Sequence, residues 1–203
     1  IFIVMSTVIC VEAEVSLTLD EMAYIAKSPV IKAVSVNGVA PLQFTDDSGK
    51  VQGISKRVLD RIAEMTGLIF EYKLYDSVEE ALNSDYDIIF GFPHHYTPEN
   101  IVLSKPFLKS ETILYINNSM NSNLLDDKIY AAVRSSALPE GIKEENSIYF
   151  NTREESLNAV EKGIADYGYG NAYSIAYYTL KNNYKNIVAI PNGKESREYC
   201  IGI

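Results

Sequence analysis

The segment Gly91–Phe107, GFPHHYTPENIVLSKPF, gathers polar side chains suited to contacting a small molecule. Thr97 followed by Pro98 is typical of a helix start, because threonine caps free backbone amides and proline fits the first helical position. A strand end that leads into the free amides of a helix start commonly forms a small-molecule site. The motif ends at Asn100, a neutral amide, so the segment predicts hydrogen bonding without ionic attraction.

Two adjacent histidines, His94 and His95, precede this predicted helix, and the sequence contains no others. Neighbouring residues on an extended chain point in opposite directions, so the pair is unsuited to holding one metal ion. With no cysteine nearby, we expect neither a metal site nor a cofactor. A pH-dependent response through the histidines is left open.

Catalysis at this segment would need a positioned base or nucleophile. Glu99 is the acid beside Asn100, and a glutamate in a first helical turn is more simply explained by the helix dipole. The sequence shows no nucleophile–base pair and no metal-ligand cluster. We therefore expect no enzymatic activity from these 203 residues.

Alternating strands and helices must position these residues. Apolar residues recur at helical spacing from Ile54 to Thr66, and Gly67 is typical of a helix end. Further helices are predicted before Pro29 and after the caps Ser77, Thr152 and Asn171. Strands are predicted at 30–36, 68–75, 87–92, 111–117, 128–133, 147–150, 165–170, 186–190 and 198–203. This alternation predicts an α/β protein of two units, each with a small, mostly parallel sheet.

The composition is that of an acidic globular protein. Its 203 residues are 47% hydrophobic and 22% charged, which suits one two-lobed domain or two small domains. A net charge of −9 without a basic cluster argues against a nucleic-acid partner or an anionic membrane surface. Two cysteines, Cys10 and Cys200, are too few for a disulfide framework.

The first residues are apolar, but the run from Ile1 to Cys10 is too short to anchor a protein in a bilayer. Small residues near Ala13 suit a signal peptidase, so residues 1–13 are predicted to be a truncated signal peptide of an extracytoplasmic protein. A buried first strand is the alternative.

Three segments resemble the type 2 periplasmic solute-binding proteins of family 3, whose fold is the Venus flytrap. VIKAVSVNGVAPLQFTDDSGKVQGISKRVLDRIAEMTGLIFEY resembles the start of lobe one, and YDIIFGFPHHYTPENIVLSKPF resembles the signature in which T-P-E-R precedes F-S-x-P-F/Y. EKGIADYGYGN is similar to the lobe-two signature G-x-A-D-x-x-x-x-D. The preceding LTLDEMAYIAKSPVIK resembles the lead-in of the extracytoplasmic sensor domains of bacterial hybrid histidine kinases.

The resemblance implies a two-lobed α/β fold with two hinge crossings, and suggests that the C-terminal part of lobe one is missing. The implied boundaries are a truncated signal peptide at 1–13, a lead-in helix at 14–29, lobe one at 30–110, a hinge strand at 111–117, lobe two at 118–198 and a return hinge strand at 199–203.

The resemblance also implies where a ligand would bind. In amino-acid-binding members, the arginine of T-P-E-R holds the ligand carboxylate, the aspartate of the lobe-two signature holds the ammonium, and two aromatic residues stack on the side chain. The matching positions here are Asn100, Asn171, Val39 and Ile54. A buried charge that loses its partner costs about 3–5 kcal/mol, so a zwitterionic amino acid is expected to bind poorly.

Other implied contacts come from the loops that end at the cleft. The candidates are Phe92, His94 and His95 in lobe one, and Arg134, Ser135 and Ser136 in lobe two. The alternative for Arg134 is a solvated loop charge, and the alternative for the serines is that they are simple turn residues.

The expected function is a ligand-sensing domain of a membrane signalling receptor, a histidine kinase or similar, that binds a small solute. The full-length protein is expected to be membrane-anchored and could carry a kinase or cyclase domain, and a homodimer is possible. The alternative is the substrate-binding protein of an ABC-type transporter for amino acids or small solutes.

Overall fold

The computed structural model describes residues 15–27, 29–93, 98, 100–120, 127–134 and 138–203. The helices are α1 (Leu19–Ile25), α2 (Ile54–Thr66), α3 (Val78–Leu82), α4 (Arg153–Glu161) and α5 (Ala172–Lys181), with a 3-10 turn at Glu144–Asn146. The strands are β1 (Val30–Val36), β2 (Phe44–Thr45), β3 (Val51–Gln52), β4 (Ile69–Tyr75), β5 (Ile88–Pro93), β6 (Leu108–Asn117), β7 (Tyr130–Val133), β8 (Ser147–Phe150), β9 (Tyr167–Asn171) and β10 (Ile187–Gly202).

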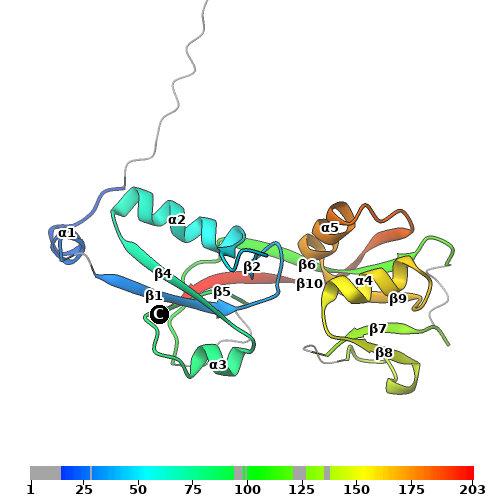
Figure 1. The fold of residues 1–203 in the computed structure, drawn as a ribbon. Helices are drawn as coiled ribbons and strands as arrows, with labels where there is room; N and C mark the ends of the chain where they lie inside the picture. Colours follow the sequence, from blue (N-terminus) through cyan, green and yellow to red (C-terminus); the bar gives the residue numbers. More distant parts are fainter. Residues whose placement is uncertain (1–14, 28, 94–97, 99, 121–126, 135–137) are drawn as a thin grey trace, which may run out of the picture.

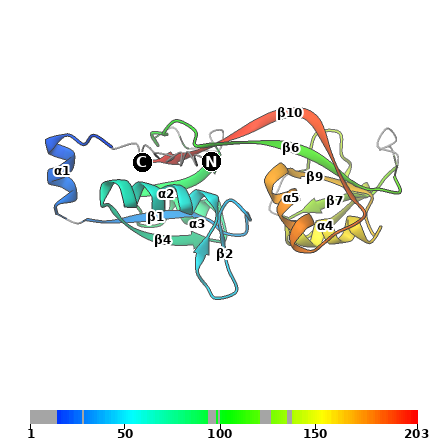
Figure 2. The same cartoon turned by 90° about the horizontal axis from the view of Figure 1, so that it is seen from above.

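One eight-stranded sheet runs through the molecule in the order β4-β1-β5-β10-β6-β9-β7-β8. In lobe one, β1 is parallel to β4 and β5; in lobe two, β7 is parallel to β8 and β9. Figure 1 shows lobe one, with α1 to α3, and lobe two, with α4 and α5, at opposite ends. The antiparallel strands β6 and β10 pass between them (Figure 2).

The two predicted strands at 186–190 and 198–203 are one long strand, β10. β10 pairs with β6 in both lobes, with an irregular register between Pro191 and Ser196. The two units therefore share one continuous sheet, where the sequence predicted a separate small sheet in each. Two crossing strands are the geometry expected of a hinge.

Lobe one has a core on each face of its sheet. Residues 33, 59, 88 and 90 form the cluster packed with α2, and residues 34, 81, 89 and 92 form the cluster packed with α3. Gly91, with φ of 68°, has no partner in the pairing of β5 with β10, so β5 has a bulge there. The bulge turns Phe92 away from the face of Phe90 and buries it beside α3.

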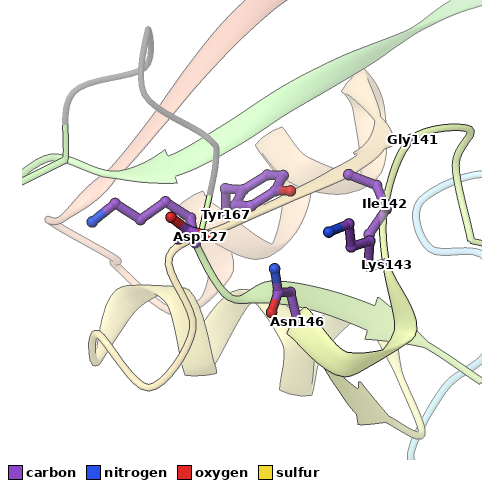
Figure 3. Close-up of a pocket in the computed structure, with 7 residues that line it drawn as sticks. Asp127, Gly141, Ile142, Lys143, Asn146 and Tyr167 are labelled. Atoms are coloured by element: carbon purple, nitrogen blue, oxygen red, sulfur yellow. The ribbon is translucent and has the colours of Figure 1, made fainter.

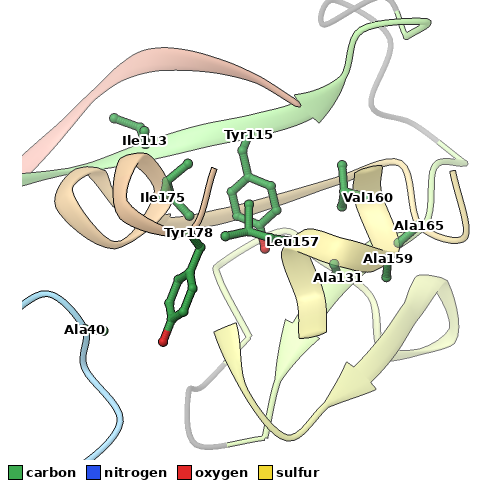
Figure 4. Close-up of a cluster of buried hydrophobic side chains, with 10 residues drawn as sticks. All are labelled: Ala40, Ile113, Tyr115, Ala131, Leu157, Ala159, Val160, Ala165, Ile175 and Tyr178. Carbon is green, nitrogen blue, oxygen red and sulfur yellow. The ribbon is translucent and has the colours of Figure 1, made fainter. Parts of the chain in front are cut away.

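Lobe two places α4 and α5 on one face of the sheet. Figure 4 shows Tyr115 pointing from β6 toward α4, where Leu157 and Val160 are buried. Tyr130 and Tyr167 belong to a separate cluster that also includes alternate residues of β6. The alternation along β6 thus supplies both cores, as expected when successive side chains of a strand point to opposite faces.

The lead-in helix α1 begins after Thr18, whose hydroxyl accepts from the amide of Glu21 while the Glu21 carboxylate accepts from the Thr18 amide. None of its residues is buried, and Leu19 is 80% exposed. A helix in this position was predicted, and the sequence placed its end correctly before Pro29. The predicted signal peptide at 1–13 lies outside the described residues, within which no helix is long and apolar enough to cross a membrane.

The prediction of a helix that begins at Pro98 is wrong. The described residues here form a turn, in which the amide of Ile101 donates to the Pro98 carbonyl at 3.1 Å, followed by extended chain. Val102 and Ile203 exchange backbone hydrogen bonds, both 3.0 Å long. Pairing with the end of β10 thus replaces helical hydrogen bonds, and Pro106 further disfavours helix by holding the preceding residue extended.

Candidate ligand-binding site

The parallel strands of both lobes end on the sides of the lobes that face each other (Figure 1), and the region between these strand ends is called the gap below. In lobe one these ends are Val36, Tyr75 and Pro93, and in lobe two they are Val133, Phe150 and Asn171. Open α/β sheets bind ligands in the crevice outside the carboxyl ends of their strands. The segments that follow these ends therefore form the candidate site.

The loop after β1 is held firmly against α2. Val39 is half-buried and exchanges backbone hydrogen bonds with Gln43. Ile54, also half-buried, is the first residue of α2, and its amide donates to the carbonyl of Pro41 at 2.9 Å. The structure therefore places Val39 and Ile54 on adjoining segments. The first amide of α2 is already occupied and is not free for an anion.

The other lobe-one candidates differ in exposure. Phe92 is only 2% exposed and belongs to the core beside α3. Its side chain therefore packs inside lobe one and offers little surface to a ligand. Asn100 is exposed in the turn after Pro98. His94 and His95 lie outside the described residues, and their predicted contact with a ligand stays a prediction.

Asn171 is occupied by contacts within the protein. Its Oδ1 accepts from the amides of Tyr173 at 2.9 Å and Ser174 at 3.3 Å, which caps α5 as predicted. Its Nδ2 donates to the hydroxyl of Tyr199 on β10 at 2.7 Å. Burial raises the pKa of Tyr199, so its phenol remains neutral and can accept this bond. Asn171 thus joins α5 to a crossing strand, and a ligand would have to compete for it.

Arg134 follows the end of β7 and is exposed. Its amide donates to the carbonyl of Phe150 at 2.9 Å, and its guanidinium carbon lies 5.8 Å from the centre of the Tyr149 ring. A cation at this distance is attracted by the ring. Ser135 and Ser136 lie outside the described residues, so their predicted roles stay predictions.

Arg153 is a candidate that the sequence reasoning missed. It is the first residue of α4, directly behind the capping Thr152, and it is partly buried. Its Nη1 donates to the hydroxyl of Tyr115 at 3.0 Å. The signal was in the sequence, because the helix dipole disfavours a cation in the first turn and such a residue needs another explanation.

The two lobes also touch directly. The rings of Phe44 on β2 and Tyr177 on α5 have centres 6.0 Å apart. Ala40 is 3% exposed and belongs to the lobe-two cluster that contains Tyr178 (Figure 4). The two lobes are therefore in apolar contact at this point.

A pocket of about 210 Å³ lies elsewhere in lobe two, as Figure 3 shows. It is lined by Asp127, Lys128, Gly141, Ile142, Lys143, Asn146 and Tyr167. These residues precede or begin β7, β8 and β9, so the pocket lies at the amino ends of the strands. We favour the opposite edge, since the carboxyl ends of both lobes meet there.

Comparison with solved structures identifies the class of fold. The chain is similar to a histidine kinase sensor domain described as similar to periplasmic binding proteins, with a TM-score of 0.68 and 18% identity over 88% of this chain and 83% of that one. It is similar to the periplasmic VFT2 domain of Bordetella pertussis BvgS, with a TM-score of 0.71 and 21% identity over 92% and 86%.

It is also similar to a substrate-binding protein of an ABC uptake transporter from Streptococcus pneumoniae, solved with bound histidine, with a TM-score of 0.68 and 17% identity over 89% and 81%. The chain therefore has the two-lobed periplasmic-binding-protein fold, or Venus flytrap, and the predicted fold class is confirmed. No protein-family model and no curated protein matches the sequence.

Proposed function

We propose that this chain is the extracytoplasmic ligand-sensing domain of a membrane signalling receptor, a histidine kinase or similar, and binds a small solute between its lobes. The observation that carries the proposal is the convergence of the strand ends of both lobes on one gap spanned by β6 and β10. A ligand that contacts both lobes favours the closed arrangement, because only that arrangement makes all the contacts.

Two observations favour a receptor over a transport protein. Sensor domains of histidine kinases are among the structural neighbours. The capped helix α1 stands before β1 with no buried residue, and its sequence resembles the lead-in found before the sensor domains of bacterial hybrid histidine kinases. The alternative, a substrate-binding protein of an ABC-type transporter, is supported by the neighbour from Streptococcus pneumoniae.

The full-length gene sequence separates these two functions. A transmembrane helix followed by a kinase or cyclase domain supports the receptor, whereas a chain that ends after lobe one supports transport. We assign no catalytic activity to this segment in either case, since its structural neighbours are sensor and solute-binding domains.

The proposed ligand is not a standard zwitterionic amino acid. Asn100 carries no charge, and Asn171 uses its amide for the cap of α5 and for Tyr199. Neither residue replaces the ion pairs that a buried carboxylate and ammonium require.

The test uses thermal unfolding of the purified chain with each free amino acid and with a panel of amine-free solutes. We expect stabilisation by a member of the second panel, because a ligand that binds only the folded state raises its stability. Native mass spectrometry checks the same point by looking for a retained small molecule. Stabilisation of several degrees by a free amino acid would contradict the proposed ligand class.

A further inference from the structure

We infer that Arg153 receives an oxyanion of the ligand, a carboxylate or a group of the same shape and charge, from the lobe-two side of the gap. This inference rests on the proposed ligand-binding function and narrows it to a chemical class. It also assigns the ionic contact with the ligand to lobe two. In lobe one, the residue that matches the arginine of T-P-E-R is the uncharged Asn100.

The charge of Arg153 has no carboxylate partner in the part of the chain that the structure describes. The adjacent acids are engaged elsewhere. Glu154 forms an ion pair with Lys181 at 3.3 Å, and Glu155 accepts from the amide of Asn151 at 2.9 Å. A partly buried cation without a counter-ion is costly, so an incoming anion would be favoured.

Hydrogen bonds hold the guanidinium in place. The hydroxyl of Tyr115, which accepts from Arg153, lies 3.0 Å from Oγ of Ser156, and that Oγ donates to the Arg153 carbonyl at 3.0 Å. This circuit uses one of the guanidinium nitrogens. The remaining N–H groups make no hydrogen bond to the described residues, and a planar guanidinium can donate two parallel bonds to a carboxylate.

Two glycines of β9 make room for this arrangement. A Cβ at Gly168 would lie 2.2 Å from the Tyr115 hydroxyl, and a Cβ at Gly170 would lie 3.3 Å from Cζ of Arg153. Because Gly168 and Gly170 have no side chains, the surface of β9 leaves space for the side chains of Tyr115 and Arg153. The guanidinium can lie against the end of β9, next to Asn171.

The location suits an anion. Arg153 follows the end of β8, one of the strand ends that face lobe one (Figure 1). The positive end of the nine-residue helix α4 adds to its charge, although the same dipole disfavours a cation for helix stability. Arg134, at the end of β7, adds a second, exposed cation to this edge. The combined field favours a negatively charged ligand group.

The test is isothermal titration with small mono- and dicarboxylates, each paired with its neutral amide. The wild-type chain is expected to bind a carboxylate and not its amide. Arg153→Gln should weaken that binding by about tenfold or more, since hydrogen bonds to charged groups are among the stronger ones. Arg153→Lys, which keeps the charge but loses the planar fork, should fall between the two.

Arg57→Gln is the matched control, because Arg57 is an exposed arginine on α2 in lobe one. This variant should bind the carboxylate as tightly as the wild-type chain does. Equal carboxylate binding by Arg153→Gln and wild type, or equal binding of carboxylate and amide, overturns the inference. If Arg153→Gln does not fold, the inference is tested by the carboxylate–amide comparison on the wild-type chain and by the binding of Arg153→Lys.

The outcomes separate the two proposals. A neutral solute that binds independently of Arg153 supports the proposed function and overturns the role of Arg153. If neither carboxylates nor neutral solutes bind, both proposals fail.

Discussion

Replacing Asn171 with alanine removes three hydrogen bonds at the junction between α5 and β10. Two of them cap α5 through the amides of Tyr173 and Ser174, and the third reaches the hydroxyl of Tyr199. Loss of an asparagine cap costs about 0.5–2 kcal/mol. Tyr199 is 3% exposed, so its hydroxyl loses a partner in a buried place, which costs about 1–3 kcal/mol.

The expected destabilisation of Asn171→Ala is therefore about 2–4 kcal/mol, which for a domain of this size lowers Tm by roughly 4–16 °C. Urea denaturation followed by circular dichroism measures the change in the free energy of unfolding. Asn171→Asp is the matched control. Aspartate caps a helix as well as asparagine does and can accept a bond from the tyrosine hydroxyl, so we expect a change within about 1 kcal/mol.

A double-mutant cycle isolates the third hydrogen bond. Asn171→Ala combined with Tyr199→Phe should show a coupling free energy of about 0.5–3 kcal/mol, because the two side chains are in direct contact. A change below about 0.5 kcal/mol for Asn171→Ala would refute the assignment of Asn171 as a structural link, since surface substitutions give changes of that size.

Three further outcomes are expected. Gly170→Ala should lower the free energy of unfolding by about 1–3 kcal/mol, because the added Cβ would lie 2.8 Å from Cδ1 of Ile175. An unchanged urea midpoint would show that β9 can accommodate the methyl group at this position. Thr18→Ala should speed hydrogen exchange in α1 without shifting the global midpoint, because α1 buries no residue; a global shift would contradict this account. Hydrogen bonds from Ser48, Gln52 and Lys50 hold the pKa of Asp46 below its ordinary value, so the stability it contributes is present above about pH 4 and is lost as the pH falls below that value. Unfolding of Asp46→Asn between about pH 2 and 4 should therefore depend less on pH than that of wild type, and equal dependence would assign the effect to other groups.

Local signals in the sequence located much of the fold. The predicted bounds of α2, Ile54 to Thr66, are those observed, because the apolar spacing and the left-handed conformation of Gly67 act within a few residues. The caps Ser77 and Thr152 begin their helices for the same reason.

The failures came from contacts between distant segments. The Pro98 signal was correct for a turn, but pairing of Val102 with Ile203 replaced the helix. The bulge at Gly91, which buries Phe92, follows from pairing with β10. The unusual place of Arg153 in the first turn of α4 could be seen in the sequence, but its contact with Tyr115, 38 positions away, could not. Such pairings leave no periodic trace in either segment.

Closure of the lobes on a solute is the central claim, and pulsed EPR tests it most directly. Spin labels at Arg61 on α2 and Leu180 on α5 would report the distance between the lobes, with Cys10 replaced by serine; both label sites are exposed, and Cys200 is buried. A panel solute that stabilises the chain should shift the distance distribution to shorter values and narrow it. A distribution unchanged at saturating solute would contradict binding between the lobes.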